Sequence, residues 1–329
     1  MGTGLKVKKT AIILLNLGGP SSQVEVKPFL ISLFSDPDII TVPQPFRYIL
    51  AHLLTRRRLK EAQHIYALLG GGSPLLKNTQ AQVVALEGEL GEGFRVFVAM
   101  RHAAPYTEMA VEEVKAYGPD EVVLLPLYPQ YSTTTTRSSF RRWNKFAQKI
   151  GIPSRFIHSY PVEDGFIEAL KELTLPHYKK AQKYGHPRVL MTAHGLPEKI
   201  IKKGDPYQHH VEETAKALVN KLGISHFDGQ LCYQSRVGPL KWIGPFTDEE
   251  IVKAAQEKRP LVVVPLSFVS EHSETLVELD MTYRTLALQE GCPSYHRVET
   301  VQTHPFFIKG LASLVKECTF LSQGENDAF

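Results

Sequence analysis

One apolar stretch that ends in a histidine decides the fold of this chain: Arg188-Val189-Leu190-Met191-Thr192-Ala193-His194-Gly195-Leu196-Pro197. Its apolar residues do not alternate with polar ones, which is typical of a strand buried on both faces of a parallel sheet. Gly195 and Pro197 favour a turn directly after this strand. Because ligands bind at the carboxyl ends of strands in open α/β sheets, His194 is a candidate functional residue.

Short apolar runs alternate with longer amphipathic stretches along most of the chain. We expect strands near residues 10–16, 94–100, 121–127, 154–159, 188–193, 229–234, 260–269 and 295–301. Helical patterns lie near residues 22–34, 45–69, 75–90, 106–117, 137–149, 163–184, 207–222, 247–257, 273–290 and 305–319. Repeated alternation of strand and helix predicts parallel sheets covered by helices. The sequence therefore predicts an α/β protein whose strands divide into two four-stranded parallel sheets.

The length of the chain predicts more than one domain. Its 329 residues exceed one small core, so two domains are the natural expectation. We place the first domain at residues 1–163 plus 303–320, with the last helix packing back on it, and the second at residues 164–302. Residues 321–329 form a polar tail that we expect to be disordered.

Composition argues against several classes of protein. A net charge of +4 is too small to indicate a nucleic-acid partner. Cys232, Cys292 and Cys318 lie far apart, which is typical of reduced thiols in the cytosol. The apolar run 11–15 is short and precedes Gly18-Gly19-Pro20, so we expect a buried first strand rather than a signal peptide. No apolar stretch approaches the ~20 residues of a transmembrane helix.

Acidic residues follow another buried strand. Glu271, Glu274 and Glu278 are spaced by three and four residues after the apolar run that ends at 269. On an α-helix this spacing would line them along one face that begins at the mouth of a cleft. A solvated helix face with acids near its N-terminus is the ordinary alternative. Together with His194, such carboxylates could move protons or bind Fe²⁺ or Zn²⁺ in preference to Mg²⁺.

Two stretches of the first half are unusual. Gly70-Gly71-Gly72-Ser73-Pro74 lacks the pattern of a nucleotide-binding loop, and we expect its backbone to pass close to a flat or bulky group. Residues 45–54 are largely apolar, and Arg56-Arg57-Arg58 follows them. One interpretation is a core-facing helix with a solvated basic end. The other is a partly exposed apolar lip beside an anion-binding cluster, suited to a ligand with carboxylates or to a membrane face.

Hydroxyl and aromatic side chains follow two other strands. Tyr131, Ser132 and Arg137 come after the run 121–127, where hydroxyls are ordinary helix caps and the other side chains could line a cleft. Trp242 follows the strand near 229–234. This residue is either part of a core or a flat wall for an aromatic ligand.

Several of these motifs occur together in one known family. In order they are Asn16-x-Gly18-Gly19-Pro20, Gly70 to Pro74, Met100-Arg101, Leu127-Tyr128-Pro129-Gln130-Tyr131-Ser132, Ala193-His194-Gly195-Leu196-Pro197, Tyr233-Gln234-Ser235-Arg236-Val237-Gly238-Pro239 through Trp242, and Phe268-Val269-Ser270-Glu271-His272-Ser273-Glu274-Thr275-Leu276. As a set they resemble ferrochelatase over about residues 10–317. The resemblance implies two Rossmann-like domains of the chelatase type. It also implies a lyase that inserts Fe²⁺ into protoporphyrin IX and releases two protons, the terminal step of heme biosynthesis.

The resemblance implies roles for individual residues. His194 and Glu274 match the family's iron-site and proton-handling pair, so both are the expected catalytic and metal-binding residues. Glu271 and Glu278 would then form an acidic path beside them. The expected substrate-binding residues are Arg57, Arg58, Tyr66, Arg101, Tyr131, Ser132, Trp242 and His272. We expect His194 and Glu274 to face each other across a pocket that grips the tetrapyrrole.

The sequence departs from the family at a few positions. His102 stands where relatives often carry an aromatic residue, and Tyr160 stands where some carry tryptophan, which affects the expected pose of the porphyrin. Only Cys318 lies where some members bind an iron–sulfur cluster, so the chain resembles the bacterial type without a cluster. We therefore expect no cofactor, with Fe²⁺ as a substrate.

Partners, location and alternatives complete these expectations. We expect protoporphyrin IX and Fe²⁺ as partners, no nucleic acid, and a cytoplasmic protein that contacts the inner face of the membrane through the 46–54 lip. A coproporphyrin III ferrochelatase and a cobalt chelatase are close alternatives. A non-catalytic tetrapyrrole carrier is an alternative from another class.

Overall fold

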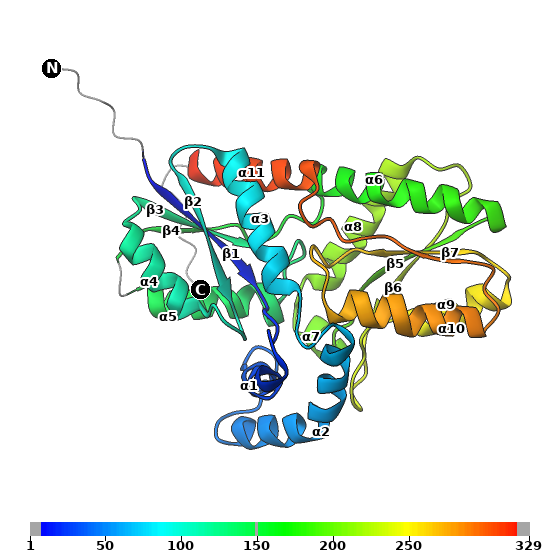
Figure 1. The fold of residues 1–329 in the computed structure, drawn as a ribbon, viewed down its shortest axis with the longest axis horizontal. Helices are drawn as coiled ribbons and strands as arrows, with labels where there is room; N and C mark the ends of the chain where they lie inside the picture. The colour runs from blue at the N-terminus through cyan, green and yellow to red at the C-terminus, as the bar shows by residue number, and fades with distance from the viewer. Residues whose placement is uncertain (1–7, 149–150, 321–329) are drawn as a thin grey trace.

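The computed structural model describes residues 8–148 and 151–320, and it contains two four-stranded parallel sheets (Figure 1). The first sheet consists of β1 (Thr10–Asn16), β2 (Phe94–Met100), β3 (Glu121–Pro126) and β4 (Ser154–Phe156), and the second of β5 (Arg188–His194), β6 (Asp228–Gln234), β7 (Leu261–Pro265) and β8 (Tyr295–Arg297). Their strand orders are β2-β1-β3-β4 and β6-β5-β7-β8, so both sheets repeat one topology. The predicted α/β fold with two four-stranded sheets is confirmed.

The strands are apolar without alternation because helices cover both faces of each sheet. All five residues of β1 from Ala11 to Leu15 are fully buried, and so are the first four of β7. Four strands end earlier than predicted: β4 ends at Phe156 and β8 at Arg297, whereas β3 and β7 end at the prolines Pro126 and Pro265. Proline lacks the N–H that would continue the ladder, so the chain leaves the sheet there.

The helices divide into those on the outer faces and those between the sheets. Outer helices are α4 (Thr107–Tyr117) and α5 (Ser138–Ala147) on the first sheet, and α9 (Thr247–Gln256) and α10 (Arg284–Gln289) on the second. Inner helices are α3 (Leu75–Leu90), α6 (Asp164–Ala181), α8 (Tyr207–Leu222) and α11 (Pro305–Phe320). The inner helices and both sheets share one continuous hydrophobic core. The two halves are therefore packed together over apolar surface.

Helix α11 joins the two halves of the molecule. It packs against α3 and β3 of the first half and against α6 at the start of the second (Figure 1). Its crossing with α6 is close, because a Cβ on Gly310 would lie 2.2 Å from Glu163 Oε2 and a Cβ on Gly165 would lie 2.3 Å from Phe306 O. The boundaries of the two domains stay a prediction, and the expected tail 321–329 lies outside the described residues.

Helices α1 (Val26–Phe34) and α2 (Phe46–Leu68) lie beyond the carboxyl end of β1 (Figure 1). The first half of α2 is exposed, with Phe46 at 66%, Ile49 at 56% and Leu53 at 61% of their full accessibility. These exposures favour the apolar lip over the core-facing helix. In the described part of the chain, no helix is long and apolar enough to span a bilayer.

Two segments that follow strands in the sheets are π-helices. The first, η2 (Thr133–Arg137), precedes α5, and the second, η4 (Glu274–Tyr283), precedes α10. The sequence predicted ordinary helices there, near 137–149 and 273–290. A π-helix bonds each amide to the carbonyl five residues back, so it presents different residues on one face than an α-helix does. The short helix α7 (Glu198–Ile201) was not predicted.

Candidate active site

His194 is the last residue of β5, at the carboxyl end of the second sheet. Its Nδ1 lies 2.6 Å from the carbonyl oxygen of Gly195, and its amide donates to Ser267 Oγ. Since a carbonyl only accepts, Nδ1 carries the proton of this bond. The Nε2 atom is therefore the nitrogen that can accept a proton or bind a metal, and the side chain stays 35% exposed.

Glu274 lies between two histidines. Its Oε1 is 3.7 Å from His194 Nε2, and its Oε2 is 3.5 Å from His272 Nε2. His272 repeats the arrangement of His194, because its Nδ1 is 3.1 Å from the carbonyl oxygen of Ser270. Both imidazoles thus turn Nε2 toward one carboxylate.

The charges of this cluster influence one another strongly. Burial alone would raise the pKa of Glu274, but the positive charges of His194 and His272 outweigh it and lower that pKa to about 2. Burial lowers the pKa of His272, yet the hydrogen bond and the charge of Glu274 outweigh it, so its pKa lies above 6.5. Glu274 is therefore an ionised carboxylate, and the neighbouring His272 imidazole binds a proton more tightly than an ordinary histidine does.

Glu278 follows Glu274 within η4 and is held by four donors. Its carboxylate accepts from Gln234 Nε2 at 3.0 Å, from the amide and hydroxyl of Ser235 at 2.9 and 2.5 Å, and from Tyr283 at 3.0 Å. Ser235 adopts a φ of 65°, which is uncommon for a residue other than glycine. Burial and then the charge of Glu274 raise the pKa of Glu278 above its ordinary value. This carboxyl can thus carry a proton more easily than Glu274 can.

Gln234 connects the two acidic residues. Its amide nitrogen donates to the backbone oxygen of Glu274 and to the carboxylate of Glu278. The sequence placed Gln234 and Ser235 in a motif without assigning them a role, and it did not single out Tyr283. The position of Gln234 could have indicated a role at the site, because it is the last residue of β6 and pairs with His194, the last residue of β5.

The predicted acidic face with Glu271 is wrong. Glu271 precedes η4, is buried, and accepts from Arg297 Nη1 at 2.6 Å and from the amide of Thr300 at 3.0 Å. None of its recorded hydrogen bonds involves His194 or Glu278. The α-helical spacing that would align the three acids does not apply, because the helix begins at Glu274 and is a π-helix.

The predicted placement of His194 and Glu274 across a pocket is also wrong. Their 3.7 Å separation leaves no room for a macrocycle between them. Both side chains follow neighbouring parallel strands, β5 and β7, and therefore emerge at the same edge of the sheet. They lie side by side, so any flat ligand must contact them from one side.

Two predicted substrate-binding residues lie near this cluster. Trp242 packs beside His194, with 6.3 Å between the ring centroids, and it stands against Gly195, where an added Cβ would lie 3.3 Å from the indole. Tyr66 lies near the end of α2 and is buried, with its hydroxyl facing Ser273 and within the field of Glu274. Burial raises the pKa of Tyr66 to about 12, so its hydroxyl stays protonated.

The two arginines of α2 lie on its surface. Arg57 is exposed, and Arg58 is partly exposed and forms an ion pair with Glu61 at 3.4 Å. Neither has a recorded contact with the His194–Glu274 pair. Their cations are available to an anionic group that approaches α2 from solvent.

Three further predicted substrate-binding residues have other partners. Arg101 bonds Ser138 Oγ at 2.6 Å and pairs with Asp36 at 2.7 Å. Ser132 is 1% exposed, and its hydroxyl donates to Asp205 and caps η2, which is incompatible with a role in binding a propionate. Tyr131 is half-buried and donates its amide to His210.

The two departures from the family pattern are buried residues with structural partners. His102 is fully buried, lies 3.1 Å from Ser32 Oγ, and has a pKa held well below 6.5 by burial and by Arg101. Tyr160 donates its hydroxyl to the carbonyl oxygen of Pro126 at 2.8 Å. Both side chains are almost completely buried, at 0% and 3% of their full accessibility.

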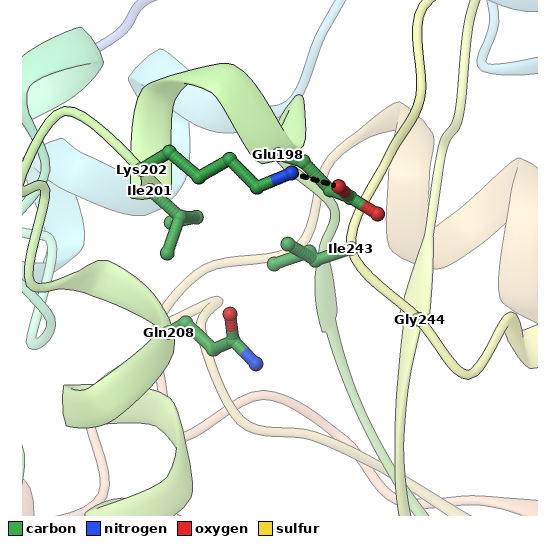
Figure 2. A pocket seen from close by; sticks show the side chains of 6 residues that line it. All are labelled: Glu198, Ile201, Lys202, Gln208, Ile243 and Gly244. Atoms are coloured by element: carbon green, nitrogen blue, oxygen red, sulfur yellow. Dashed lines mark hydrogen bonds and ion pairs between the residues drawn. The ribbon is translucent and has the colours of Figure 1, made fainter.

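A shallow pocket of about 310 Å³ lies beside the turn that follows His194 (Figure 2). It is lined by Glu198, Ile201, Lys202, Gln208, Ile243 and Gly244, and Figure 2 shows Lys202 bonded to Glu198. None of the predicted site residues lines it. Within residues 8–148 and 151–320, no set of three or more His, Cys, Asp or Glu side chains has the arrangement of a metal site.

The two four-stranded sheets with their flanking helices form a two-domain Rossmann-like fold of the chelatase type. SirB from Bacillus subtilis with Fe³⁺ superposes with a TM-score of 0.57 and 14% identity, covering 97% of this chain and 99% of that chain. CbiX, described as the terminal enzyme of siroheme biosynthesis in denitrifying bacteria, superposes with a TM-score of 0.51 and 14% identity, covering 96% and 100%. At this identity the likeness concerns the fold alone.

Sequence comparison then gives the family. The ferrochelatase family model matches residues 9–319. Ferrochelatase of Wolbachia sp. subsp. Drosophila simulans is 49% identical over 93% of this chain and 98% of its own length, and that of Caulobacter vibrioides is 48% identical over 94% and 90%. The chain belongs to the ferrochelatase family, which confirms the resemblance seen in its motifs.

Proposed function

We propose that this chain inserts Fe²⁺ into protoporphyrin IX at the cluster formed by His194, Glu274 and His272. Membership of the ferrochelatase family gives the reaction, a step of heme synthesis, and does not favour the coproporphyrin, cobalt or carrier alternatives. The observation that supports this site is one carboxylate with each oxygen within 3.7 Å of an imidazole Nε2. As a metal chelatase, the enzyme would belong to the lyases.

Insertion requires that two pyrrole N–H protons leave while the metal enters. His194 is suited to take a proton, because its Nδ1 is committed to Gly195 and its Nε2 is turned toward solvent and Glu274. An ionised Glu274 beside Nε2 stabilises the imidazolium that forms. His194 is therefore the proposed general base.

Glu278 is suited to receive protons from the cluster. It lies one turn beyond Glu274 on η4, and Gln234 bonds to both residues. Its raised pKa lets it accept a proton that Glu274, with a pKa of about 2, does not retain. We infer that protons leave along Glu278, with Ser235 and Tyr283 holding its carboxylate in place.

The cluster suits a metal that passes through rather than one that stays. His194 and Glu274 supply two ligands of the type that Fe²⁺ accepts, and His272 lies beyond Glu274 in the same row. A lasting metal site has more protein ligands in a closed shell. Two ligands leave positions open for porphyrin nitrogens, so we propose iron as a substrate, with no resident cofactor and no iron–sulfur cluster.

Residues around the cluster are suited to hold the macrocycle. The indole of Trp242 offers a flat apolar wall next to His194, and Tyr66 borders the cluster from α2. The cations of Arg57 and Arg58 on the same helix suit the two propionates. We propose these four residues as the substrate-binding set.

A metal-insertion assay tests the proposed function. Purified protein is mixed with Fe²⁺ or Co²⁺ and with protoporphyrin IX or coproporphyrin III, and loss of free-base fluorescence is followed. We expect the highest kcat/KM for Fe²⁺ with protoporphyrin IX. Tight porphyrin binding without metal-dependent loss of the free-base spectrum would support a carrier and overturn the proposal.

We further propose a cytoplasmic protein that contacts the membrane through the lip, defined as residues 46–54. The lip exposes Phe46, Ile49 and Leu53, and Arg56 and Arg57 follow on the same helix. Exposed apolar residues beside cations are typical of helices that bind at an anionic lipid interface.

Vesicle sedimentation tests the lip. Vesicles that contain anionic phospholipid should retain the wild-type protein, and the double variant Ile49→Ser/Leu53→Ser should stay in the supernatant. Val84→Ser is the matched control, because Val84 is 72% exposed but lies on α3. Equal retention of all three proteins would contradict contact through the lip.

A further inference from the structure

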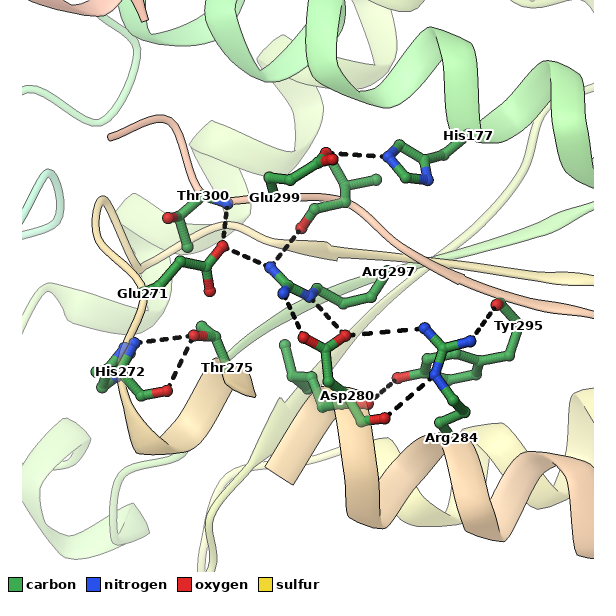
Figure 3. A network of polar contacts seen from close by, with 12 residues as sticks. His177, Glu271, His272, Thr275, Asp280, Arg284, Tyr295, Arg297, Glu299 and Thr300 are labelled. Carbon is green, nitrogen blue, oxygen red and sulfur yellow. Dashed lines mark hydrogen bonds and ion pairs between the residues drawn. The ribbon is translucent and has the colours of Figure 1, made fainter. Parts of the chain in front are cut away.

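Arg297, the last residue of β8, joins both parts of the segment that carries the proposed site (Figure 3). Its guanidinium donates from Nη1 to Glu271 Oε1 at 2.6 Å and from Nε to Asp280 Oδ1 at 2.9 Å, and Nη2 pairs with Asp280 Oδ2. The side chain is only 8% exposed. Between Glu271 and Asp280 lie His272, Glu274 and Glu278.

The two partners of Arg297 mark the ends of this segment. Glu271 stands directly before His272, and its Oε1 also accepts from the amide of Thr300. Asp280 lies within η4, two residues beyond Glu278. Because the guanidinium fork is planar and rigid, it fixes the distance between these two carboxylates.

The first half of the molecule holds the same segment at its start. Asn78 Nδ2 on α3 donates to the backbone oxygen of Glu271 at 3.0 Å. Gln82 Nε2, also on α3, donates to the backbone oxygens of Val269 and Gln302. The start of the segment is thus anchored from α3 as well, whereas Arg297 connects that start with η4 from outside the segment.

A π-helix makes such a connection valuable. The π-helix is rare, and it occurs frequently at functional sites. The orientation of Glu274 and Glu278 depends on η4 keeping this register. A buried ion pair is weak evidence for stability by itself, because desolvation offsets much of the attraction, and geometry is its better-attested use.

We propose that Arg297 is a positioning residue. By holding Glu271 and Asp280 at a fixed separation, it sets the geometry of the cluster formed by His194, Glu274 and His272. This inference rests on the proposed function of His194 and Glu274. Arg297 has no recorded contact with His194, His272 or Glu274, so it acts through the segment and not on substrate.

Steady-state kinetics with both substrates varied test this proposal. In Arg297→Gln, the KM for Fe²⁺ should rise about tenfold, the lower end of what loss of a supporting contact costs a metal site. The KM for protoporphyrin should stay within about twofold of the wild-type value, because Arg297 has no hydrogen bond or ion pair to Trp242 or Tyr66. Arg297→Lys keeps the charge but loses the fork, so it should restore only part of the Fe²⁺ affinity.

Arg284→Gln is the matched control. Arg284 also pairs with Asp280, at 3.8 Å, and bonds the backbone oxygens of Asp280 and Tyr295, but it does not reach Glu271. Its KM for Fe²⁺ should equal that of the wild type. A merely structural role of Arg297 would lower the melting temperature and the active fraction while leaving both KM values unchanged, and that result overturns the proposal.

Glu274→Gln separates this proposal from the proposed function. If Glu274→Gln loses activity while Arg297→Gln keeps the wild-type KM for Fe²⁺, the positioning role fails and the site stands. If Glu274→Gln retains full activity, the proposed site itself fails, and the proposal for Arg297 fails with it.

Discussion

Replacement of Glu274 by glutamine removes the charge from between the two imidazoles and keeps the shape of the side chain. In the wild type, an imidazolium at 3.5–3.7 Å from the carboxylate gains about 4–5 kcal/mol of attraction at an effective dielectric constant of about 20. Burial opposes this attraction. The fall of the Glu274 pKa from 4.5 to about 2 corresponds to roughly 3 kcal/mol of net stabilisation, at about 1.4 kcal/mol per pKa unit.

The same carboxylate faces any cation that binds at His194 Nε2. Losing roughly 3 kcal/mol of stabilisation corresponds to a fall of roughly 10²-fold in kcat/KM for Fe²⁺. The KM for protoporphyrin should change less than about twofold, since Trp242 and α2 are untouched. The assay is Fe²⁺ insertion under anaerobic conditions, with free-base fluorescence as readout and circular dichroism as a test of folding.

Glu290→Gln provides the matched control for this experiment. Glu290 is an exposed carboxylate just after α10, so its variant should have wild-type kinetics. A folded Glu274→Gln protein with a kcat/KM for Fe²⁺ within about fivefold of the wild type would contradict the electrostatic role of Glu274. So would an equal loss in Glu290→Gln, because the effect would then come from net charge.

Two further changes test the glycine run and the acidic path. A Cβ on Gly72 would lie 2.4 Å from the backbone oxygen of Ser21, so Gly72→Ala should lower the free energy of unfolding by about 1–3 kcal/mol in urea titrations. Gly88→Ala, in an open position of α3, should leave it unchanged or raise it by up to about 1 kcal/mol; equal effects would contradict the packing argument. Because the pKa of Glu278 is raised above 4.5 in the folded state, that state binds more protons than the unfolded one, and this contribution to stability is lost as pH rises from 4.5 through the folded pKa. Glu278→Gln lacks this loss, so its unfolding free energy relative to the wild type should improve as pH rises from 4.5 through the folded pKa of Glu278, and a constant difference would count against the raised pKa.

The fold could be predicted because local signals were strong. The apolar runs of β1 and β7 lack alternation, and that pattern reports burial on both faces. The ends of strands were less clear, because Pro126 and Pro265 terminate pairing inside apolar runs that continue beyond them. The exposure of the lip could not be predicted either. The sequence of an apolar helix does not show whether other parts of the protein cover its apolar face.

The sequence could predict that His194 and Glu274 lie near each other, but not how they are oriented. His194 and Glu274 follow adjacent strands, so topology alone brings them to one edge of the sheet. The π-helical form of η4 has no simple signature in sequence, and it changed which acids share a face. Likewise, the sequence near Glu271 does not indicate its ion pair with Arg297, 26 residues further on. The sequence near Ser132 does not indicate its hydrogen bond to Asp205.

The proposed mechanism depends on the Nε2 atom of His194, held beside Glu274, acting as the base of metal insertion. The decisive measurement is the rate of Fe²⁺ insertion into protoporphyrin IX by purified His194→Ala. We predict a loss of about 10²- to 10⁴-fold, the range expected for a general base, at an unchanged melting temperature. A folded His194→Ala protein that inserts iron within a few-fold of the wild-type rate would show that His194 is not the base.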